Sequence, residues 1–303
     1  MSVFNKFPPV RGVLQEKVNL GKKARFGVGG IADILFVPED MDDLILFLRN
    51  IPKKEKVTVL GAMSNVLIRD DGIRGVVVIL GDWFGKVFEE DNILEVGAAV
   101  HCSKLSTIAM DHELGGFEFM MGLPGTIGGA IKMNAGCFGS EIADVLFECE
   151  AVTSKGQIKW LKSKDIKFGY RTSGIPDDLI ITRAWFKGVP NVPYSIPKKV
   201  KEIVEKRKES QPLEKKTCGS TFKNPADKKA WELIDAAGCR GMKVGGAVVS
   251  EKHCNFLVNE GEATADDIET LGEKIVKQVF EKTGVTLEWE VIRLGEKGGN
   301  TQS

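Results

Sequence analysis

The 303-residue sequence lacks paired cysteines, an excess of charge of either sign and long apolar runs. Its six cysteines form no CxxC pair, which argues against a zinc site or a disulfide framework and favours reduced thiols. Basic and acidic residues both number 42, so no net positive field favours nucleic acid. No segment reaches the ~18 apolar residues of a membrane span. We therefore expect a cytoplasmic protein that binds no metal, nucleic acid or membrane.

What the sequence does contain is 43% apolar residues, enough to fill the core of one large or two ordinary domains. An apolar run at 31–37 predicts a strand, and Asp40 caps a helical pattern that runs to residue 50. Strands are further predicted at 56–61, 75–80, 92–100, 147–153 and 179–187, with a helix capped by Ser103 at 103–114. Helices and strands are therefore mixed along the chain.

A proline-rich segment that starts at Pro190 marks a predicted domain boundary near residue 190. A lysine-rich helix with a solvated face follows, and then a helix at 230–237 and strands around 245–250 and 255–261. Thr264 and Asp267 form a capping-box pattern at the start of the last helix. Its predicted core stripe comprises Ile268, Leu271, Ile275, Val279 and Phe280.

Glycine-rich backbone is the most unusual feature of the chain. The stretch GLPGTIGGAIKMNAGCFG at 122–139 holds six glycines and a single charge, Lys132. Bare backbone leaves N–H groups free to meet the oxygens of a ligand without lysines. Two weaker loops, GVGGIAD at 27–33 and LGAMSNVLIRD at 60–70, resemble it. Each loop alone is compatible with an ordinary turn, whereas the three together favour a dinucleotide cofactor.

Seven motifs occur in one fixed order along the chain. They read GVGG-x-AD, LG-x-x-SN, G-x-PG-x-IGGA-x-x-MNAG-x-x-G, GYR-x-S, GS-x-FKNP, GGA-x-VSEKH-x-NF and LE-x-EV-x-x-x-G. The same order is found in UDP-N-acetylenolpyruvoylglucosamine reductases (MurB), the flavoenzymes of peptidoglycan precursor synthesis. This chain resembles that family from about residue 20 to residue 295.

The resemblance implies an α+β fold with an FAD-binding domain of the vanillyl-alcohol-oxidase or PCMH type, built from two subdomains, over residues 22–189. An N-terminal segment, 1–21, precedes it, and a smaller α/β substrate-binding domain, 190–303, follows. The implied reaction reduces UDP-N-acetylglucosamine enolpyruvate to UDP-N-acetylmuramate. NADPH first reduces a non-covalent FAD, which then passes a hydride to the enolpyruvyl double bond. The expected enzyme is a monomer.

The resemblance also assigns residues to the cofactor and to the substrate. The implied FAD contacts are Gly29, Gly61, Ser64, Asn65, Pro124, Gly125, Thr126, Gly128, Gly129, Asn134, Ala135, Gly136 and Ile142. The implied substrate contacts are Gln211, Lys223 and Asn224, of which Lys223 has a purely structural alternative.

Three residues match the catalytic positions of the family. Arg171 in GYRTSG would meet the developing negative charge on the substrate, Glu290 in LEWEV would share a hydrogen bond with the same carboxylate, and Ser220 would donate the proton. The alternatives are a surface ion-pair arginine, an ordinary strand glutamate, and a turn or cap serine.

The chain departs from the family pattern at several positions. Arg25-Phe26-Gly27 stands where a threonine and an aromatic are common, and Trp289 replaces a frequent proline. Ile292 occupies the place of a frequent arginine, and Arg293 lies one residue later, so a diphosphate contact from Arg293 is not expected. Only 48 residues separate Arg171 from Ser220, which indicates the branch without an inserted lobe over the nucleotide.

Two other functions stay open at this point. One is a flavoprotein of the same fold that oxidises an alcohol or sugar, and the other is a non-enzymatic nucleotide-binding cell-wall protein. His253 has no triad or metal partner in the sequence and is expected to be a packed histidine. We expect Cys218 and the five tryptophans to serve in packing or at domain interfaces.

Overall fold

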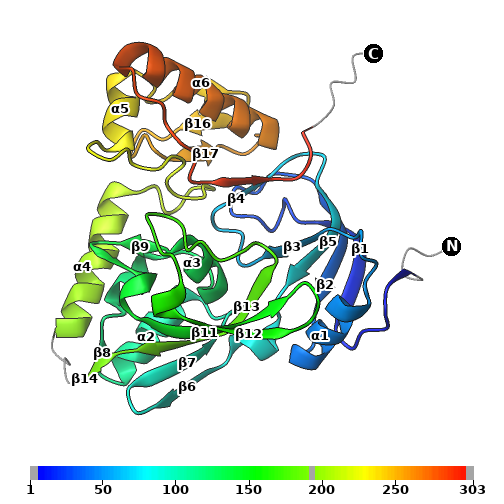
Figure 1. The fold of residues 1–303 in the computed structure, drawn as a ribbon. Coiled ribbons are helices and arrows are strands. Elements are labelled where there is room, and N and C mark those ends of the chain that lie inside the picture. The colour runs from blue at the N-terminus through cyan, green and yellow to red at the C-terminus, as the bar shows by residue number, and fades with distance from the viewer. Residues whose placement is uncertain (1–5, 191–194, 298–303) are drawn as a thin grey trace. The chain divides into compact units, whose positions relative to one another are not determined.

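A computed structural model describes residues 6–190 and 195–297 (Figure 1). Contacts between Cα atoms divide the chain into two compact units. The first comprises Met1–Glu16, Ile34–Ala62 and Gly75–Lys206, and the second comprises Lys17–Asp33, Met63–Arg74 and Arg207–Ser303. The boundary near residue 190 and the segment 1–21, of which 1–5 lie outside the described residues, remain predictions.

A four-stranded sheet has the strand order β1-β2-β5-β3. Its strands are β1 (Val13–Asn19), β2 (Ile31–Val37), β5 (Ile73–Ile79) and β3 (Val57–Leu60). Helix α1 (Met41–Asn50) follows β2, and Asp40 caps it by accepting the N–H of Asp43, as its sequence predicts. The helix buries Leu44 and Phe47 in a core shared with Phe36. Although β3 follows α1 in the chain, β5 lies between β2 and β3 in the sheet.

A five-stranded antiparallel sheet belongs to the first unit and has the order β12-β11-β13-β7-β6. Its strands are β12 (Ile158–Lys162), β11 (Leu146–Thr153), β13 (Leu179–Lys187), β7 (Ile93–Gly97) and β6 (Val87–Glu90). The three central strands confirm the predictions at 92–100, 147–153 and 179–187. The two edge strands were not predicted, because they bury almost no side chain and so lack an apolar pattern.

Helices α2 (Cys102–Asp111), α3 (Ile127–Met133) and α4 (Ser195–Ser210) complete the main elements of the first unit, α4 as far as Lys206. The predicted cap of α2 is wrong, because the helix begins one residue earlier, after His101, and no side chain caps it. The shorter elements are η2 (Asp82–Gly85), β8 (Leu114–Gly115), η3 (Glu118–Gly122), β9 (Gly136–Cys137), β10 (Ser140–Glu141), η4 (Ile142–Asp144), η5 (Ser163–Asp165) and β14 (Val189–Pro190).

The second unit is built around helix α6 (Ala265–Thr283), whose predicted capping box of Thr264 and Asp267 is present. It packs with α5 (Ala230–Ala236) and the antiparallel strands β15 (Lys243–Val244), β16 (Ala247–Val249) and β17 (Leu257–Asn259). Strand β18 (Ile292–Leu294) runs parallel to β4 (Val66–Ile68). This pairing brings an early segment of the chain into the C-terminal unit.

Some predicted core positions are wrong. Phe280 is 54% exposed, because α6 turns that side of its last turns toward solvent while Ile275 and Val279 are buried. Trp160 and Trp231 are also exposed, at 55% and 40%, so these two tryptophans do not lie in the core. In the parts of the chain that the structure describes, no helix has both the length and the apolar character needed to cross a membrane.

All six cysteines are thiols outside any disulfide, and every one except the half-buried Cys137 is buried. Burial raises the pKa of Cys102, Cys149 and Cys218 to about 12. Because only the thiolate reacts, we expect iodoacetamide at pH 8 to label these thiols about three orders of magnitude more slowly in the native than in the denatured protein. Mass spectrometry of labelled peptides measures both rates, and fast native labelling of Cys218 would contradict the burial argument.

Candidate functional site

The glycine-rich stretch forms a turn and the short helix α3, and its glycines serve two purposes. Gly128 packs closely, because its N–H donates to Ala98 O at 2.9 Å and an added Cβ would lie 3.1 Å from the Cβ of Ala98. Gly125 has a φ of +111°, which a side chain rarely permits. At Gly129, by contrast, an added Cβ would meet no described atom within 4 Å. Part of this stretch therefore needs glycine for packing, and part presents bare backbone to open space.

Two of the predicted cofactor loops meet in the first unit. A Cβ added to Gly61, at the end of β3, would lie 2.4 Å from Thr126 Oγ1. Thr126 stands directly before α3, and the backbone next to it is fixed by the N–H of Cys102, which donates to Gly125 O at 3.0 Å. Pro124 is exposed beside it. The first of the weaker glycine loops, by contrast, lies in the second unit, where a Cβ on Gly29 would meet Ile68 O at 2.2 Å.

The end of the glycine-rich stretch is buried. Asn134 has no exposed surface and adopts a φ of +43° as the C-cap of α3. Its amide nitrogen donates to Gly169 O at 3.1 Å, and its oxygen accepts the N–H of Ala143 at 3.1 Å. Ile142 is equally buried, and its N–H donates to Ala135 O. Gly136 allows close pairing with Ser140 and Glu141, because an added Cβ would lie 2.6 Å from Ser140 O. These residues shape the stretch from inside the core.

Arg171 lies in the first unit, at the tip of a two-residue hairpin loop. The flanking residues Gly169 and Thr172 exchange backbone hydrogen bonds of 2.8 and 3.1 Å. Arg171 has a φ of +58°, in the left-handed region that non-glycine residues seldom occupy. Its guanidinium lies over the ring of the exposed Tyr170, 5.1 Å from the centroid. The loop therefore presents a half-buried cation on a constrained backbone.

Ser220 and Glu290 lie in the second unit, and its backbone hydrogen bonds bring their segments together. The N–H of Glu290 donates to Thr221 O at 2.8 Å, and Phe222 forms a bridge with Trp289. Ser220 itself forms a bridge with Phe256. Both residues are half-buried, and Gly219 has a φ of +83°. The predicted proton donor and the predicted carboxyl group thus stand on adjacent stretches of backbone.

Asn65, predicted to contact the cofactor, also contacts the Glu290 segment. The side-chain amide of Asn65 donates to Glu290 O at 3.0 Å, and the backbone carbonyl of Asn65 accepts the N–H of Ile292 at 3.0 Å. Ser64 is half-buried next to it. The main chain of Glu290 is therefore held by Thr221 on one side and Asn65 on the other.

The three predicted substrate residues have contacts within the second unit. Lys223 pairs with Glu288 at 3.6 Å, and its N–H donates to the carbonyl of the same residue. Asn224 is exposed, and its side-chain oxygen accepts the N–H of Ala230 at the start of α5. The side-chain oxygen of Gln211, directly after α4, accepts a hydrogen bond of 3.0 Å from the guanidinium of Arg207 in the last turn of that helix. These contacts hold the local backbone and leave the predicted substrate roles untested.

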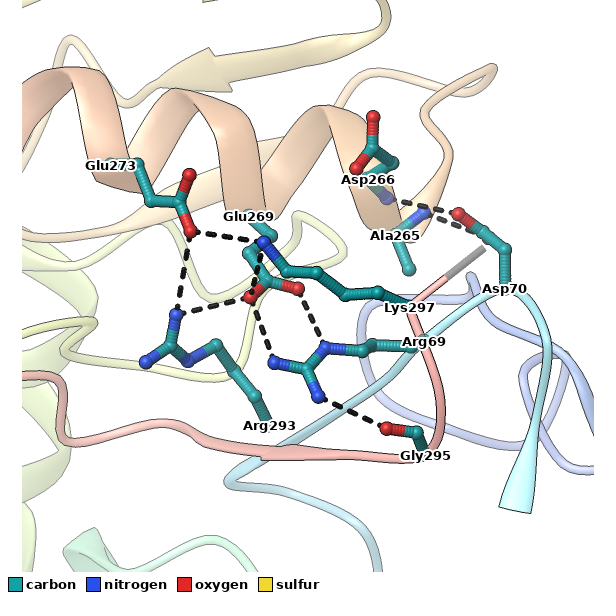
Figure 2. A network of polar contacts seen from close by, with 9 residues as sticks. All are labelled: Arg69, Asp70, Ala265, Asp266, Glu269, Glu273, Arg293, Gly295 and Lys297. Atoms are coloured by element: carbon teal, nitrogen blue, oxygen red, sulfur yellow. Dashed lines mark hydrogen bonds and ion pairs between the residues drawn. The ribbon is translucent and has the colours of Figure 1, made fainter. Parts of the chain in front are cut away.

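Figure 2 shows a charge cluster of the second unit centred on Glu269 of α6, whose side chain is 3% exposed. Arg69, directly after β4, donates to both of its carboxylate oxygens at 2.9 Å and to Gly295 O at 3.0 Å. Arg293 and Lys297 lie 3.1 and 3.5 Å from the same carboxylate. The hydrogen bond from Arg69 is the main cause of the lowered pKa of Glu269. The cluster fixes the strand pair β4 and β18 to α6.

Arg293 is held by this cluster. Its guanidinium pairs with Glu269 and Glu273 and lies over the ring of Trp289, 4.6 Å from the centroid. Sequence reasoning missed Arg69 and its neighbour Asp70, whose carboxylate accepts the N–H groups of Ala265 and Asp266. Both lie in the predicted loop 60–70, but nothing in the sequence says that their partners lie some 200 residues later.

His253 and Cys218 have the packing roles expected of them. Burial is the main cause that lowers the pKa of His253, whose ring lies 4.6 Å from that of Phe256 and accepts the N–H of Asn255. Cys218 is buried beside Val66 O, at 3.5 Å. No group of three metal-ligating side chains occurs among residues 6–190 and 195–297.

Comparison with known proteins places both halves of the chain. An FAD binding domain model matches residues 32–162, and a model for the C-terminal domain of UDP-N-acetylenolpyruvoylglucosamine reductase matches 211–294. The enzyme of that name from Bradyrhizobium sp. (strain ORS 278) is 47% identical, over 96% of this chain and 95% of its own length. The one from Gluconobacter oxydans (strain 621H) is 46% identical, over 97% and 96%.

A solved structure supports the same conclusion. The crystal structure of UDP-N-acetylenolpyruvylglucosamine reductase (MurB) from Thermus caldophilus matches with a TM-score of 0.83 and 32% identity, covering 94% of this chain and 100% of that chain. The expected α+β fold, with an FAD-binding domain and a MurB C-terminal domain, is confirmed. The chain therefore belongs to the UDP-N-acetylenolpyruvoylglucosamine reductase family.

Proposed function

We propose that this protein is a cytoplasmic, monomeric enzyme that reduces UDP-N-acetylglucosamine enolpyruvate to UDP-N-acetylmuramate with NADPH and FAD, and that Arg171, Ser220 and Glu290 carry the reaction. The observation that carries the assignment of residues is the backbone pairing of Glu290 with Thr221, next to Ser220. This pairing is evidence that the carboxyl group of Glu290 and the hydroxyl of Ser220, the proposed proton donor, act together on one substrate.

The residues of the first unit fit FAD. Gly61 and Thr126 bring two predicted cofactor loops together, and Gly129 offers backbone that a ligand atom can approach closely. The stretch 122–139 has one charged side chain, Lys132, which suits a cofactor that stays bound and is met by backbone N–H groups. When bound there, FAD supplies the hydride that it has taken from NADPH.

Arg171 and Glu290 would act on the charge that hydride addition leaves behind. Addition at one carbon of the enolpyruvyl double bond places negative charge on the other carbon, which is conjugated with the substrate carboxylate. A fixed guanidinium stabilises this charge more strongly in the transition state than in the substrate, which is the condition for catalysis. Glu290, in its protonated form, donates a hydrogen bond to the same carboxylate. The constrained loop of Arg171 limits the reorganisation that the reaction requires.

Ser220 would complete the reaction by protonating the carbon that carries the negative charge. A hydroxyl group is a weak acid, but this carbanion-like centre is far more basic than water, so a positioned serine suffices. Its half-buried position is compatible with approach to a substrate, as is the open space around Gly219 before it, where an added Cβ would meet no described atom within 4 Å.

A substitution at Gly129 tests the cofactor contact without disturbing the protein. Because an added Cβ meets no described atom within 4 Å, Gly129→Ala is expected to leave the melting temperature of the apoprotein unchanged or slightly higher. It should weaken FAD binding about 10- to 100-fold, which corresponds to the roughly 1–3 kcal/mol that overpacking costs. Titration of apoprotein with FAD measures the effect.

Gly85 provides the matched control, because a Cβ there also meets no described atom within 4 Å and the residue lies in η2, outside the predicted cofactor loops. Gly85→Ala should bind FAD as the unsubstituted protein does. If Gly129→Ala also binds FAD normally, its backbone does not contact the cofactor.

The overall reaction has a direct optical test that separates the candidate functions. The purified protein should be yellow, NADPH should bleach it anaerobically, and UDP-N-acetylglucosamine enolpyruvate should restore the colour. If an alcohol or sugar bleaches the flavin and the enolpyruvyl compound does not restore the colour, the protein is better explained as another flavoenzyme of this fold. A colourless protein that binds the nucleotide favours the non-enzymatic alternative.

A further inference from the structure

The backbone of Arg171 requires an external support. A non-glycine residue in the left-handed region costs free energy, and it persists where the surrounding structure fixes it on both sides. The two hydrogen bonds between Gly169 and Thr172 close the hairpin, but they do not connect it to the rest of the unit. Two residues of the C-terminal half of the glycine-rich stretch, Asn134 and Lys132, provide such connections.

Asn134 supports the N-terminal side of the hairpin. The side chain is fully buried, donates to Gly169 O at 3.1 Å and accepts the N–H of Ala143 at 3.1 Å. A buried amide with both ends engaged has one stable orientation, since turning it would leave its donor and acceptor groups unsatisfied. The start of the Arg171 loop is therefore fixed to the end of α3.

Lys132 supports the C-terminal side. Its ammonium group donates to Ile175 O at 2.6 Å and to Pro176 O at 2.7 Å, and it pairs with the exposed Asp177 at 3.0 Å. The hydroxyl of Ser173, itself 1% exposed, donates to the carbonyl of Lys132 at 2.9 Å. Segment 173–177 is thus tied to α3 by both the side chain and the main chain of one lysine.

These contacts decide between two roles for the only charged residue of the stretch 122–139. A lysine that binds a pyrophosphate must direct its ammonium group at the ligand. Lysine has three donors, and here the three acceptors that face its ammonium group all belong to residues 175–177. The charge is therefore used to hold a neighbouring loop.

We infer that Lys132 is a positioning residue for Arg171. It holds the arginine hairpin at a fixed distance from helix α3, whose N-terminal half carries the predicted cofactor contacts Gly128 and Gly129. The inference rests on the proposed role of Arg171 in binding the substrate carboxylate. It assigns Lys132 no contact with substrate or cofactor.

The test compares Lys132→Met with K132R in the FAD-loaded enzyme. K132M keeps the length of the side chain and removes its donors, so the hairpin loses one anchor. We expect the concentration of enolpyruvyl substrate that gives half-maximal flavin reoxidation, and the Kd of UDP-N-acetylmuramate by calorimetry, to rise about 10- to 100-fold. Reduction by NADPH should change less than about twofold, and K132R should recover most of the loss.

Three controls separate positioning from general damage. Lys104→Met removes an exposed lysine of α2 and should leave both half-reactions unchanged. R171A should show the substrate defect by itself, and adding K132M to R171A should change it by less than about twofold, because a positioning residue acts through its target. Ser173→Ala, which removes the bond to the Lys132 carbonyl and leaves the lysine in place, tests the same anchor if K132M does not fold.

Each remaining outcome overturns a specific claim. Normal product binding by K132M and S173A, equal slowing of both half-reactions, or additive effects of K132M and R171A would overturn the positioning role. Normal substrate binding and reoxidation by R171A would overturn the proposed role of Arg171 instead. The failure of the inference is therefore distinguishable from the failure of the proposed function.

Discussion

Ser220→Ala is expected to slow reoxidation of the reduced flavin by the enolpyruvyl substrate by about two orders of magnitude or more, the range typical of a lost general acid. Reduction by NADPH should be nearly unchanged, because only the second half-reaction consumes the proton. The substitution removes one oxygen, while the bridge of residue 220 with Phe256 and the hydrogen bonds of Thr221 with Asn255 and Glu290 are made by the backbone. Anaerobic stopped-flow absorbance at the flavin band measures both half-reactions separately.

The matched control is Ser103→Ala, which removes an exposed hydroxyl on α2 and should leave both rates as they are. Solvent deuterium should slow reoxidation in the unsubstituted enzyme if the proton transfer by Ser220 limits that step. If S220A slows the two half-reactions equally, Ser220 is not the proton donor and its backbone position serves the structure alone.

Arg69→Met is expected to lower the free energy of unfolding by about 3 kcal/mol, at the low end of the cost of breaking a buried ion pair. The low end applies because the Arg69 side chain is 24% exposed, whereas Glu269 is 3% exposed and would keep Arg293 and Lys297 as partners. The substitution also removes the hydrogen bond to Gly295 O, which supports the turn after β18. Urea unfolding of the holoenzyme, with the flavin at saturating concentration, measures the change.

Arg74 supplies the control, since it is an arginine of the same unit with two ion pairs, to Asp33 and Glu296, but its side chain is 52% exposed. Exposed ion pairs contribute little, so Arg74→Met should lower the free energy of unfolding much less than Arg69→Met does. Equal losses from R69M and R74M would contradict the argument that burial of Glu269 determines the effect.

The pH dependence of stability gives the same argument a second signature. Because Arg69 lowers the folded-state pKa of Glu269 below its unfolded value, this carboxylate stabilises the fold above the unfolded pKa. The contribution is lost as the pH falls through the lowered folded-state pKa. Replacing Arg69 raises that pKa, so the acid-side loss of stability should be smaller in R69M than in the unsubstituted protein.

Much of the secondary structure followed from periodicity and caps. The capping box at Thr264, the cap at Asp40 and the three central strands of the five-stranded sheet lie where their patterns predict. Periodicity failed where tertiary environment sets burial, as at the exposed Phe280 and in the edge strands β6 and β12. An edge strand without a buried face gives no alternation to detect.

The glycine-rich stretch shows the same division for the site. Its many glycines and single charge indicated close approach of a ligand and little need for cations. Only the structure separates Gly128, which is packed against Ala98, from Gly129, which faces open space. Only the structure shows that the ammonium group of Lys132 binds acceptors of residues 175–177.

The sequence by itself determined the family, the fold class and the identity of Arg171, Ser220 and Glu290 as candidates, since motifs are runs of neighbouring residues that can be read directly. The tertiary structure alone decided what holds those candidates. Arg69 meets Glu269 across 200 residues, and Asn65 meets Glu290 across 225. The physical reason is that a hydrogen bond or ion pair depends on distance in space, which chain folding sets and sequence separation does not reveal.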